Sequence, residues 1–238
     1  MIFFGIFRRY ACLICLIILV AFNGYYFFIH RSLTPIVYVE NFFFGPSDDI
    51  LDFIIYQDLT EEYEFLNTKT DNNPAIVFAG DSITKRFNLK EFFPALDILN
   101  RGIFSDTTYG LLSRIEDNIN SLNISKLFIM IGYNDLEYRT NKEIVRNIQK
   151  IVSKIKKCDI YIQSLLPVHT SRHADNSRIV EINKSLKMMC ADNNVTFVEL
   201  HSSFIDSLGG MDDSFSRDGT HPNVAGYILW SKLVVPFL

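Results

Sequence analysis

The chain has few of the features that mark several classes of protein. Its 238 residues contain no run of five lysine or arginine residues, and the formal net charge is −4. This charge balance gives no indication of nucleic-acid binding. No internal repeat or low-complexity tract occurs either. A chain of this length, with 48% hydrophobic residues, is therefore expected to form one globular domain with a sizeable core, plus an appended segment.

Cysteine is also scarce, with four residues in the chain. Cys12 and Cys15 lie inside an N-terminal apolar run, which disfavours both a disulfide and a metal site there. Cys158 and Cys190 are isolated and lack C-x-x-C spacing. We predict that these two are small buried hydrophobic side chains, as free cysteines usually are, while a disulfide between them stays open.

The N-terminal segment is the longest hydrophobic run. Residues 10–29 are uncharged and mostly apolar, and a helix of that length spans about 30 Å, the thickness of the bilayer core. Arg8 and Arg9 precede the run, which favours the N-terminus inside and the rest of the chain outside. We predict that residues 1–30 form a signal anchor, giving a single-pass membrane protein whose main domain lies on the non-cytoplasmic side.

A cleaved signal peptide is the alternative, and it would give a secreted protein. Its apolar core would end near Ala21, but bulky residues interrupt every small-x-small cleavage site that follows. Residues 31–73 are expected to be a connector, within which residues 48–66 have mixed helical periodicity and several acidic residues. The main domain is expected to span residues 74–238.

From residue 74 onward, short apolar runs alternate with helical periods. The apolar runs predict strands at residues 75–79, 97–100, 126–131, 160–166 and 196–200. The helical periods predict helices at residues 107–119, 141–157, 176–191 and 223–234. Alternation of this kind predicts an α/β fold with a parallel sheet covered on both faces.

Two polar motifs near opposite ends of this domain have the residues of a nucleophile and its base. Ser82 follows Gly80-Asp81 directly after the first predicted strand. A serine at the point where a buried strand gives way to a loop is exposed at the sheet edge and can act as a nucleophile. Asp218 precedes His221 by three residues, so that the carboxylate can orient the imidazole as a base.

Two further motifs offer the donors that an oxyanion needs. Gly102 lies in Asn-Arg-Gly-Ile and Asn134 in Gly-Tyr-Asn-Asp, and each motif follows a predicted strand. They supply a backbone N–H and a side-chain amide. Because ligands bind at the carboxyl ends of parallel strands, Ser82, Gly102 and Asn134 are expected at one edge of the sheet. His221 opens the last predicted helix, which can bring it back to that edge.

These four motifs, in this order, resemble the SGNH (GDSL-type) hydrolase family. The matching positions are Ser82, Gly102, Asn134 and His221, with Asp218 matching the acid. The resemblance covers roughly residues 74 to 238 and implies a three-layer flavodoxin-like (SGNH) fold with a five-stranded parallel sheet. It also implies a carboxylic ester hydrolase that needs no cofactor. Ser82 would attack the ester, and the N–H groups of Ser82 and Gly102 and the amide of Asn134 would hold the oxyanion.

Other residues compete for roles in this site. Asp81, Asp212 and Asp213 also precede His221, but Asp81 adjoins the nucleophile and the other two are surface candidates, so Asp218 is the predicted acid.

The loop at residues 167–173 should overhang the same edge of the sheet. We predict that His169 and Arg172 contact substrate there, with Arg172 suited to an anionic group. A solvated loop is the alternative. His169 and His173 have no carboxylate partner with ligand spacing, so no metal is predicted.

The resemblance leaves the substrate open. With the domain exported, we expect a serine esterase that removes short acyl groups, above all O-acetyl groups, from a glycan outside the membrane. The alternatives are a lysophospholipase or lipase acting on membrane lipid, an acyltransferase, and a non-catalytic binding module. The expected partners are a small-molecule or glycan acyl ester and the membrane, through the N-terminal helix, and no nucleic acid.

Overall fold

A computed structural model describes residues 48–69, 75–156, 158–170 and 176–238. The chain divides into two compact units, Met1–Ile54 and Ile55–Leu238, and the second contains the sheet. The signal anchor predicted at residues 1–30 lies outside the described residues. Within the described ranges, every helix is too short or too polar to cross a bilayer.

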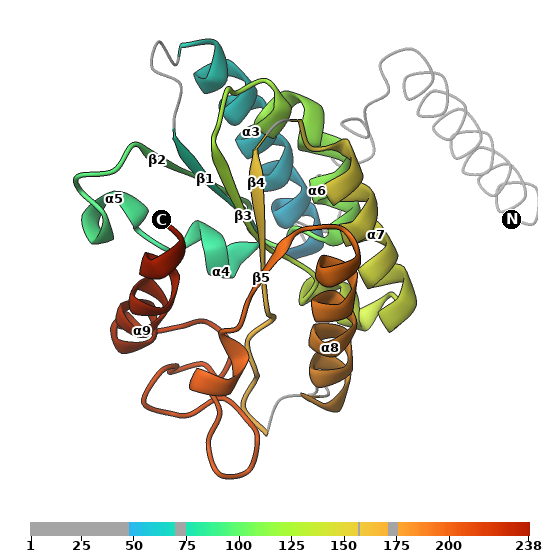
Figure 1. The fold of residues 1–238 in the computed structure, drawn as a ribbon, viewed down its shortest axis with the longest axis vertical. Helices are drawn as coiled ribbons and strands as arrows, with labels where there is room; N and C mark the ends of the chain where they lie inside the picture. Colours follow the sequence, from blue (N-terminus) through green and yellow to red (C-terminus); the bar gives the residue numbers. More distant parts are fainter. Residues whose placement is uncertain (1–47, 70–74, 157, 171–175) are drawn as a thin grey trace, which may run out of the picture. The chain divides into compact units, whose positions relative to one another are not determined.

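Five parallel strands form the central sheet in the order β2-β1-β3-β4-β5 (Figure 1). They are β1 (Ile76–Gly80), β2 (Ile98–Gly102), β3 (Lys126–Met130), β4 (Asp159–Gln163) and β5 (Thr196–Val198). Strand β1 is buried along its whole length, as expected for a central strand of a sheet covered on both faces. The predicted α/β fold with a five-stranded parallel sheet is confirmed.

Helices cover both faces of this sheet (Figure 1). On one face lie α6 (Thr108–Ile115), α7 (Asn141–Lys154), α8 (Asn176–Asp192) and the part of α3 (Asp48–Thr68) from Ile55 onward. On the other face lie α4 (Ser82–Lys85), α5 (Leu89–Phe92) and α9 (Val224–Val234). A π-helical turn, Glu116–Asn120, continues α6, and short 3-10 helices occupy Asn134–Glu137, His201–Ser203 and Val235–Phe237.

Helix α7 illustrates how the sequence determines these elements. Thr140 and Glu143 form a capping box at its start, in which each side chain accepts a bond from the other residue's backbone N–H. Its apolar stripe, which includes Ile144, Ile148 and Ile151, is buried against the sheet as the periodicity predicts.

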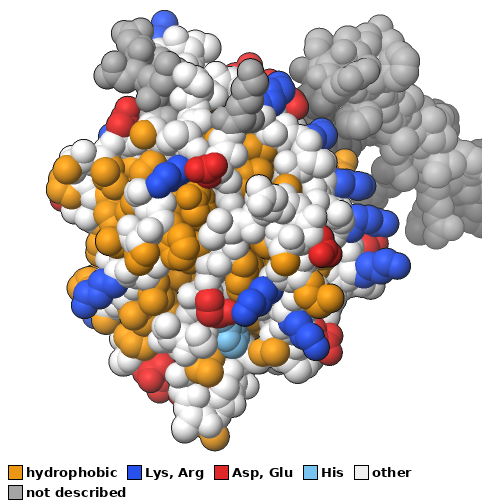
Figure 2. Space-filling view, in the orientation of Figure 1, with side chains coloured by type: hydrophobic (Ala, Val, Ile, Leu, Met, Phe, Trp, Pro, Cys, Tyr) orange, Lys and Arg blue, Asp and Glu red, His pale blue; other side chains and the backbone are white. Residues whose placement is uncertain are grey.

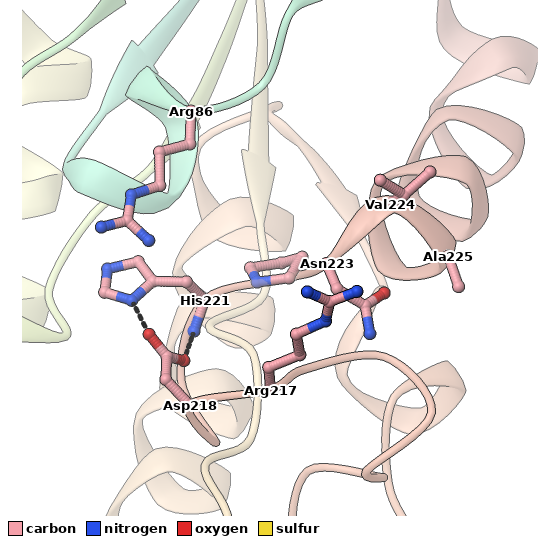
Figure 3. Close-up of a pocket in the computed structure, with 8 residues that line it drawn as sticks. Arg86, Arg217, Asp218, His221, Asn223, Val224 and Ala225 are labelled. Atoms are coloured by element: carbon pink, nitrogen blue, oxygen red, sulfur yellow. Dashed lines mark hydrogen bonds and ion pairs between the residues drawn. The ribbon is translucent and has the colours of Figure 1, made fainter.

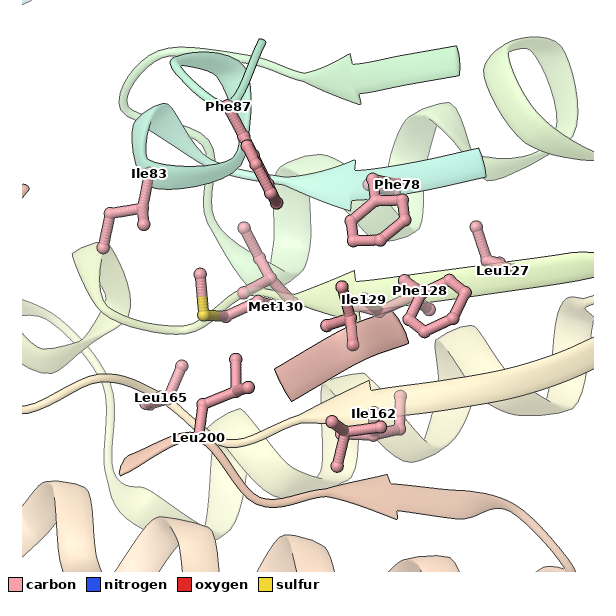
Figure 4. Close-up of a cluster of buried hydrophobic side chains, with 14 of the residues drawn as sticks. Phe78, Ile83, Phe87, Leu127, Phe128, Ile129, Met130, Ile162, Leu165 and Leu200 are labelled. Carbon is pink, nitrogen blue, oxygen red and sulfur yellow. The ribbon is translucent and has the colours of Figure 1, made fainter. Parts of the chain in front are cut away.

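Aromatic side chains stack across the sheet in the core (Figure 4). The ring of Phe128 on β3 lies 4.5 Å from that of Phe78 on β1 and 4.5 Å from that of Tyr161 on β4. On the α9 side, the indole of the buried Trp230 donates to Gln163 Oε1 at 2.7 Å. These contacts fix α9 and the ends of the strands relative to each other. Cys158 and Cys190 are free thiols. Cys190 is buried as predicted, whereas Cys158 is only half-buried.

The part of α3 from Ile55 onward packs into the domain, although residues 31–73 are predicted to form a connector. The buried Tyr63 donates its hydroxyl to the carbonyl of Gly102 at 2.8 Å, and Tyr56 donates to the carbonyl of Gly110 at 2.9 Å. The compact unit with the sheet thus begins at Ile55, earlier than the predicted boundary at residue 74. These contacts are hydrogen bonds of tyrosine hydroxyls, and the pattern of apolar residues in the sequence does not predict them.

The surface carries hydrophobic side chains mainly on the α5 and α9 side of the face that Figure 2 shows. Val224 and Ile228 of α9, and Val235 directly after it, are among the exposed large hydrophobic residues. Charged side chains of both signs lie at right on the same face (Figure 2).

Candidate active site

Ser82 lies where β1 ends and α4 begins, at the carboxyl edge of the sheet. The preceding Asp81 caps α4, because its Oδ1 accepts the backbone N–H of Ile83 at 2.9 Å. Gly80 allows the turn to pack closely, since a Cβ there would lie 2.2 Å from the carbonyl oxygen of Met130. The local sequence therefore places a half-buried hydroxyl at the start of a short helix.

His221 and Asp218 complete a hydrogen-bonded chain with Ser82. Ser82 Oγ lies 2.9 Å from His221 Nε2, and His221 Nδ1 lies 2.7 Å from Asp218 Oδ2 (the latter pair is drawn in Figure 3). With the carboxylate facing Nδ1, the proton of a neutral ring is held at that nitrogen. Nε2 is then free to accept a proton from the serine hydroxyl. This is the geometry of a nucleophile, a base and an orienting acid.

The turn that carries Asp218 and His221 is built around the carboxylate. Its Oδ1 accepts the backbone N–H groups of Thr220 at 2.9 Å and His221 at 2.8 Å, and Gly219 provides the required positive φ of 76°. Partial burial acts to raise the pKa of Asp218, but these N–H groups and the imidazole outweigh it and hold that pKa well below its usual range. The acid is therefore ionised throughout the neutral range.

Contacts between distant segments bring the motifs together. The hydroxyl of Tyr227 on α9 donates to the carbonyl of Ile83 at 2.8 Å, which anchors the helix after His221 to the helix that contains Ser82. The hydroxyl of Tyr133 lies 3.5 Å from Thr220 Oγ1. The residue before Asn134 thus adjoins the loop that carries the acid and the base.

Asn134 begins a 3-10 helix directly beyond β3. Its Nδ2 donates to the backbone carbonyl of Asp106 at 2.8 Å, which fixes the amide against the turn between β2 and α6. An amide nitrogen carries two hydrogens, and the described residues provide no acceptor for the second one. Asn134 therefore keeps a donor for an oxyanion.

Gly102 does not fit the predicted role. Its backbone N–H donates to Asn100 Oδ1 at 2.8 Å, so the donor is already used. Gly102 pairs with Gly80 in the sheet, and Gly80 comes two residues before Ser82. A Cβ at this position would lie 2.4 Å from the backbone nitrogen of Lys85. The structure thus corrects the prediction: this glycine permits close packing of β2 against α4.

Several buried charged residues that were not predicted from the sequence pack next to the site. Arg114 of α6 makes an ion pair with Asp106 at 2.7 Å, and it donates to the carbonyl of Arg101 at 2.9 Å. Burial raises the pKa of Asp106 to about 6, although Arg114 acts to lower it. Burial also raises the pKa of Asp81 to about 7, and Asp106 contributes in the same direction.

Asp135 connects the Asn134 motif to α6. Its carboxylate accepts the backbone N–H of Thr108 at 2.8 Å and the hydroxyl of Thr108 at 2.6 Å, and Arg139 lies 3.1 Å away. In the sequence, the only signal for Asp135 is its place beside Asn134. The only signal for Asp106 is its place at the start of a predicted helix.

Of the two residues predicted to contact substrate, the structure describes His169. The backbone N–H of His169 donates to the carbonyl of Gly219 at 2.8 Å, so this loop adjoins the turn of Asp218. The ring of His169 lies 3.5 Å from Asp213 Oδ1. Arg172 and His173 lie outside the described residues. Within the described part of the chain, no group of three or more His, Cys, Asp or Glu side chains could hold a metal ion.

A cavity of about 510 Å³ opens beside the base (Figure 3). Its lining includes Arg86, Arg217, Asp218, His221 and the first residues of α9. The site thus combines a serine hydroxyl in hydrogen-bond contact with a histidine and an adjoining space large enough for a small ligand.

The sequence profile of the GDSL-like Lipase/Acylhydrolase family matches residues 78–229. The chain therefore belongs to this family, and it is a carboxylic ester hydrolase of the GDSL (SGNH) type.

Its relatives include enzymes named for acetyl esters. It is 25% identical over 179 residues to platelet-activating factor acetylhydrolase IB subunit alpha2 from Rattus norvegicus, which covers 71% of this chain and 78% of that protein. A solved structure from Streptococcus pneumonia, whose name refers to platelet activating factor, is 25% identical with a TM-score of 0.76 and covers 79% of this chain and 95% of that one. The acetyl xylan esterase AlAXEase, 18% identical with a TM-score of 0.62, shares the fold over 69% of this chain and 99% of its own.

Proposed function

We propose that this protein hydrolyses short-chain acyl esters, above all O-acetyl esters of a glycan, through an acyl-enzyme formed on Ser82. The observation that carries the proposal is the chain of contacts from Ser82 Oγ to His221 Nε2 at 2.9 Å and from His221 Nδ1 to Asp218 Oδ2 at 2.7 Å. A serine hydroxyl is a weak nucleophile until a base takes its proton, and this geometry provides that base.

In the first half of the reaction, Ser82 Oγ attacks the ester carbonyl while His221 Nε2 takes the hydroxyl proton. Asp218 stabilises the imidazolium that forms. The negative charge on the tetrahedral carbon's oxygen is held by the Asn134 amide and by the backbone N–H of Ser82. As the first residue of α4, Ser82 has an N–H without an acceptor inside the helix. One such donor typically lowers the activation barrier by about 3 kcal/mol.

The proton on His221 then goes to the leaving alcohol oxygen, and the ester C–O bond breaks to give the acyl-enzyme. In the second half, a water molecule gives a proton to His221 Nε2 and attacks the acyl carbonyl. His221 returns this proton to Ser82 Oγ as the bond between Oγ and the acyl carbon breaks, which releases the acid and restores the serine hydroxyl. Every proton in this scheme moves through Nε2 of His221.

The preference for acetyl groups rests on the relatives, since the 25% identical enzyme is named an acetylhydrolase. The choice of a glycan rests on the shared fold with an acetyl xylan esterase and on the expected export of the domain. A membrane lipid is the second candidate. It is favoured by the exposed apolar residues of α9, of which Val224 lines the cavity beside His221.

The experiment is turnover of p-nitrophenyl acetate, butyrate and palmitate by the full chain, beside Ser82→Ala as the matched control. Circular dichroism checks that both proteins are folded. We expect Ser82-dependent cleavage that falls from acetate to palmitate, and release of acetate from acetylated xylo-oligosaccharides. A preference for palmitate would transfer the proposal to lipids. Equal turnover by Ser82→Ala, or none by the folded wild type, would overturn it.

We also propose that residues 1–30 anchor the enzyme with its domain on the non-cytoplasmic side. The support is the uncharged run at residues 10–29 that follows Arg8 and Arg9. Fractionation should find the full chain in membranes, and protease added to the non-cytoplasmic side should degrade the domain. Recovery in the medium with a shortened N-terminus would favour the cleaved signal peptide instead.

A further inference from the structure

Two arginines flank the cavity beside the catalytic base. Arg86 ends α4, and its backbone N–H donates to the carbonyl of Ser82 at 3.1 Å. Arg217 directly precedes Asp218. Both side chains are exposed, and neither forms an ion pair with any carboxylate of the described residues. In Figure 3 the guanidinium of Arg86 lies beside the His221 ring, and that of Arg217 lies beside Asn223.

The cavity has more positive than negative charge. Asp218 is the one carboxylate among its described lining residues. Its Oδ2 contacts the His221 ring, and its Oδ1 accepts the backbone N–H groups of Thr220 and His221. One carboxylate thus stands against two guanidinium groups, and the lining keeps a net positive charge. An arginine pairs best with a planar or tetrahedral anion, a carboxylate or a phosphate, through two parallel hydrogen bonds.

The chemistry of the reaction indicates which part of the substrate reaches this cavity. His221 must give its proton to the leaving oxygen, so the alcohol portion of the ester lies on the His221 side of the reacting carbon. The donors for the oxyanion, the Asn134 amide and the Ser82 N–H, belong to the other side. Because His221 lines the cavity, the cavity receives the alcohol portion and not the acyl chain. Pro222, Val224 and Ala225 add an apolar wall against which a sugar ring or a glycerol chain can lie.

We propose that Arg86 and Arg217 bind an anionic group, a carboxylate or a phosphate, on the alcohol portion of the ester. The enzyme thereby selects acetylated acidic alcohols over neutral ones. This inference rests on the proposed function, because it requires the ester to be cleaved at Ser82. It makes the two arginines residues that determine specificity, in addition to the residues that act on the reacting atoms.

The test compares kcat/KM of the full chain for an O-acetylated methyl glucuronoside and for the matching O-acetylated methyl glucoside, which lacks the carboxylate. Acetylated glycerol phosphate is a third substrate that separates a phosphate from a carboxylate. We expect the better anionic substrate to exceed the neutral one by about tenfold or more, the range of one charge-assisted contact. The preference should shrink as salt is added, because both guanidinium groups are exposed.

Variants connect this preference to the arginines. Arg86→Gln and Arg217→Gln should each lower the ratio of anionic to neutral kcat/KM, and the double variant should bring it close to one. Arg146→Gln is the matched control, because Arg146 is an exposed arginine on α7 outside the cavity lining. Its ratio should equal that of the wild type. A ratio that the double variant leaves unchanged would overturn the assignment to these side chains.

A binding measurement covers the case in which none of the three acetylated substrates is cleaved. Glucuronate or inorganic phosphate should inhibit hydrolysis of p-nitrophenyl acetate more strongly than glucose does, and the double variant should lose this inhibition. Absence of inhibition by both anions, in an enzyme that cleaves p-nitrophenyl acetate through Ser82, would overturn the anion site and leave the proposed function intact. Loss of Ser82-dependent turnover would instead overturn the proposed function.

Discussion

Asp218 contacts His221 at two points. One carboxylate oxygen accepts the backbone N–H of His221 at 2.8 Å, and the other lies 2.7 Å from Nδ1 of its ring. The same side chain therefore sets both the path of the main chain and the orientation of the imidazole. A three-residue turn is enough to aim Nε2 at Ser82.

This double contact predicts the effect of Asp218→Asn. The amide oxygen can still accept the backbone N–H, so the turn should persist. If the amide nitrogen then faces Nδ1, the ring must carry its proton at Nε2, the wrong nitrogen for a base. We expect kcat to fall by about 10⁴-fold, the loss that the same change causes in serine proteases, with little change in melting temperature.

The control for this prediction is Asp212→Asn. Asp212 is another acid upstream of His221, and its Oδ1 accepts the backbone N–H of Ser214 at 2.8 Å, a contact that asparagine can also make. Steady-state kinetics on p-nitrophenyl acetate should show wild-type activity for this variant. Activity of Asp218→Asn within tenfold of the wild type would show that His221 needs no acid partner.

Asn134→Ala tests the side chain assigned to the oxyanion. Its loss removes a donor that acts on charge developed in the transition state, so kcat should fall by about 10²- to 10³-fold while KM changes little. The measurement is kcat and KM on one short-chain ester, with the melting temperature as a check because the bond to Asp106 is also lost. A change confined to KM would indicate that Asn134 only binds the substrate.

Several features of the fold follow from local signals in the sequence. The run at residues 75–79 predicts β1 because a central strand must be apolar on both faces, and the stripe containing Ile144 and Ile148 predicts the buried face of α7. The order of motifs along alternating strands and helices brings Ser82 and His221 to one edge. These features can be predicted from the spacing of apolar and polar residues along the chain.

The errors arose where a contact in the folded chain, not the position in the sequence, decides the role. Gly102 follows a strand in the sequence, but the acceptor that uses its N–H, Asn100 Oδ1, depends on how the chain turns. The pairing of Asp106 with Arg114 and the docking of Tyr63 on Gly102 also depend on the folded backbone. A single sequence contains no direct signal for such pairs.

Tyr63→Phe tests whether α3 is part of the folded domain. The Tyr63 hydroxyl donates to the Gly102 carbonyl at 2.8 Å and accepts from Lys85 Nζ at 2.8 Å. The loss of a buried hydrogen bond should lower the free energy of unfolding by about 1 kcal/mol or more, which corresponds to a fall in melting temperature of about 2–4 °C. Tyr109→Phe is the control, because Tyr109 is 64% exposed. Equal melting temperatures for the two variants would argue that α3 contributes little to the domain.

Asp81→Asn should change how stability depends on pH. The pKa of Asp81 is raised to about 7 by burial, above the value of about 3.9 expected in the unfolded chain. Between these values the folded protein holds a proton that the unfolded chain releases, so stability falls as pH rises from about 4 to about 7. Asparagine keeps the acceptor for the Ile83 N–H but cannot ionise. Urea unfolding at pH 5 and pH 8 should therefore show a smaller loss of stability in the variant, by an amount on the order of 2 kcal/mol. The exposed Asp58→Asn should behave as the wild type, and an equal loss in Asp81→Asn would mean that Asp81 is already ionised at pH 5.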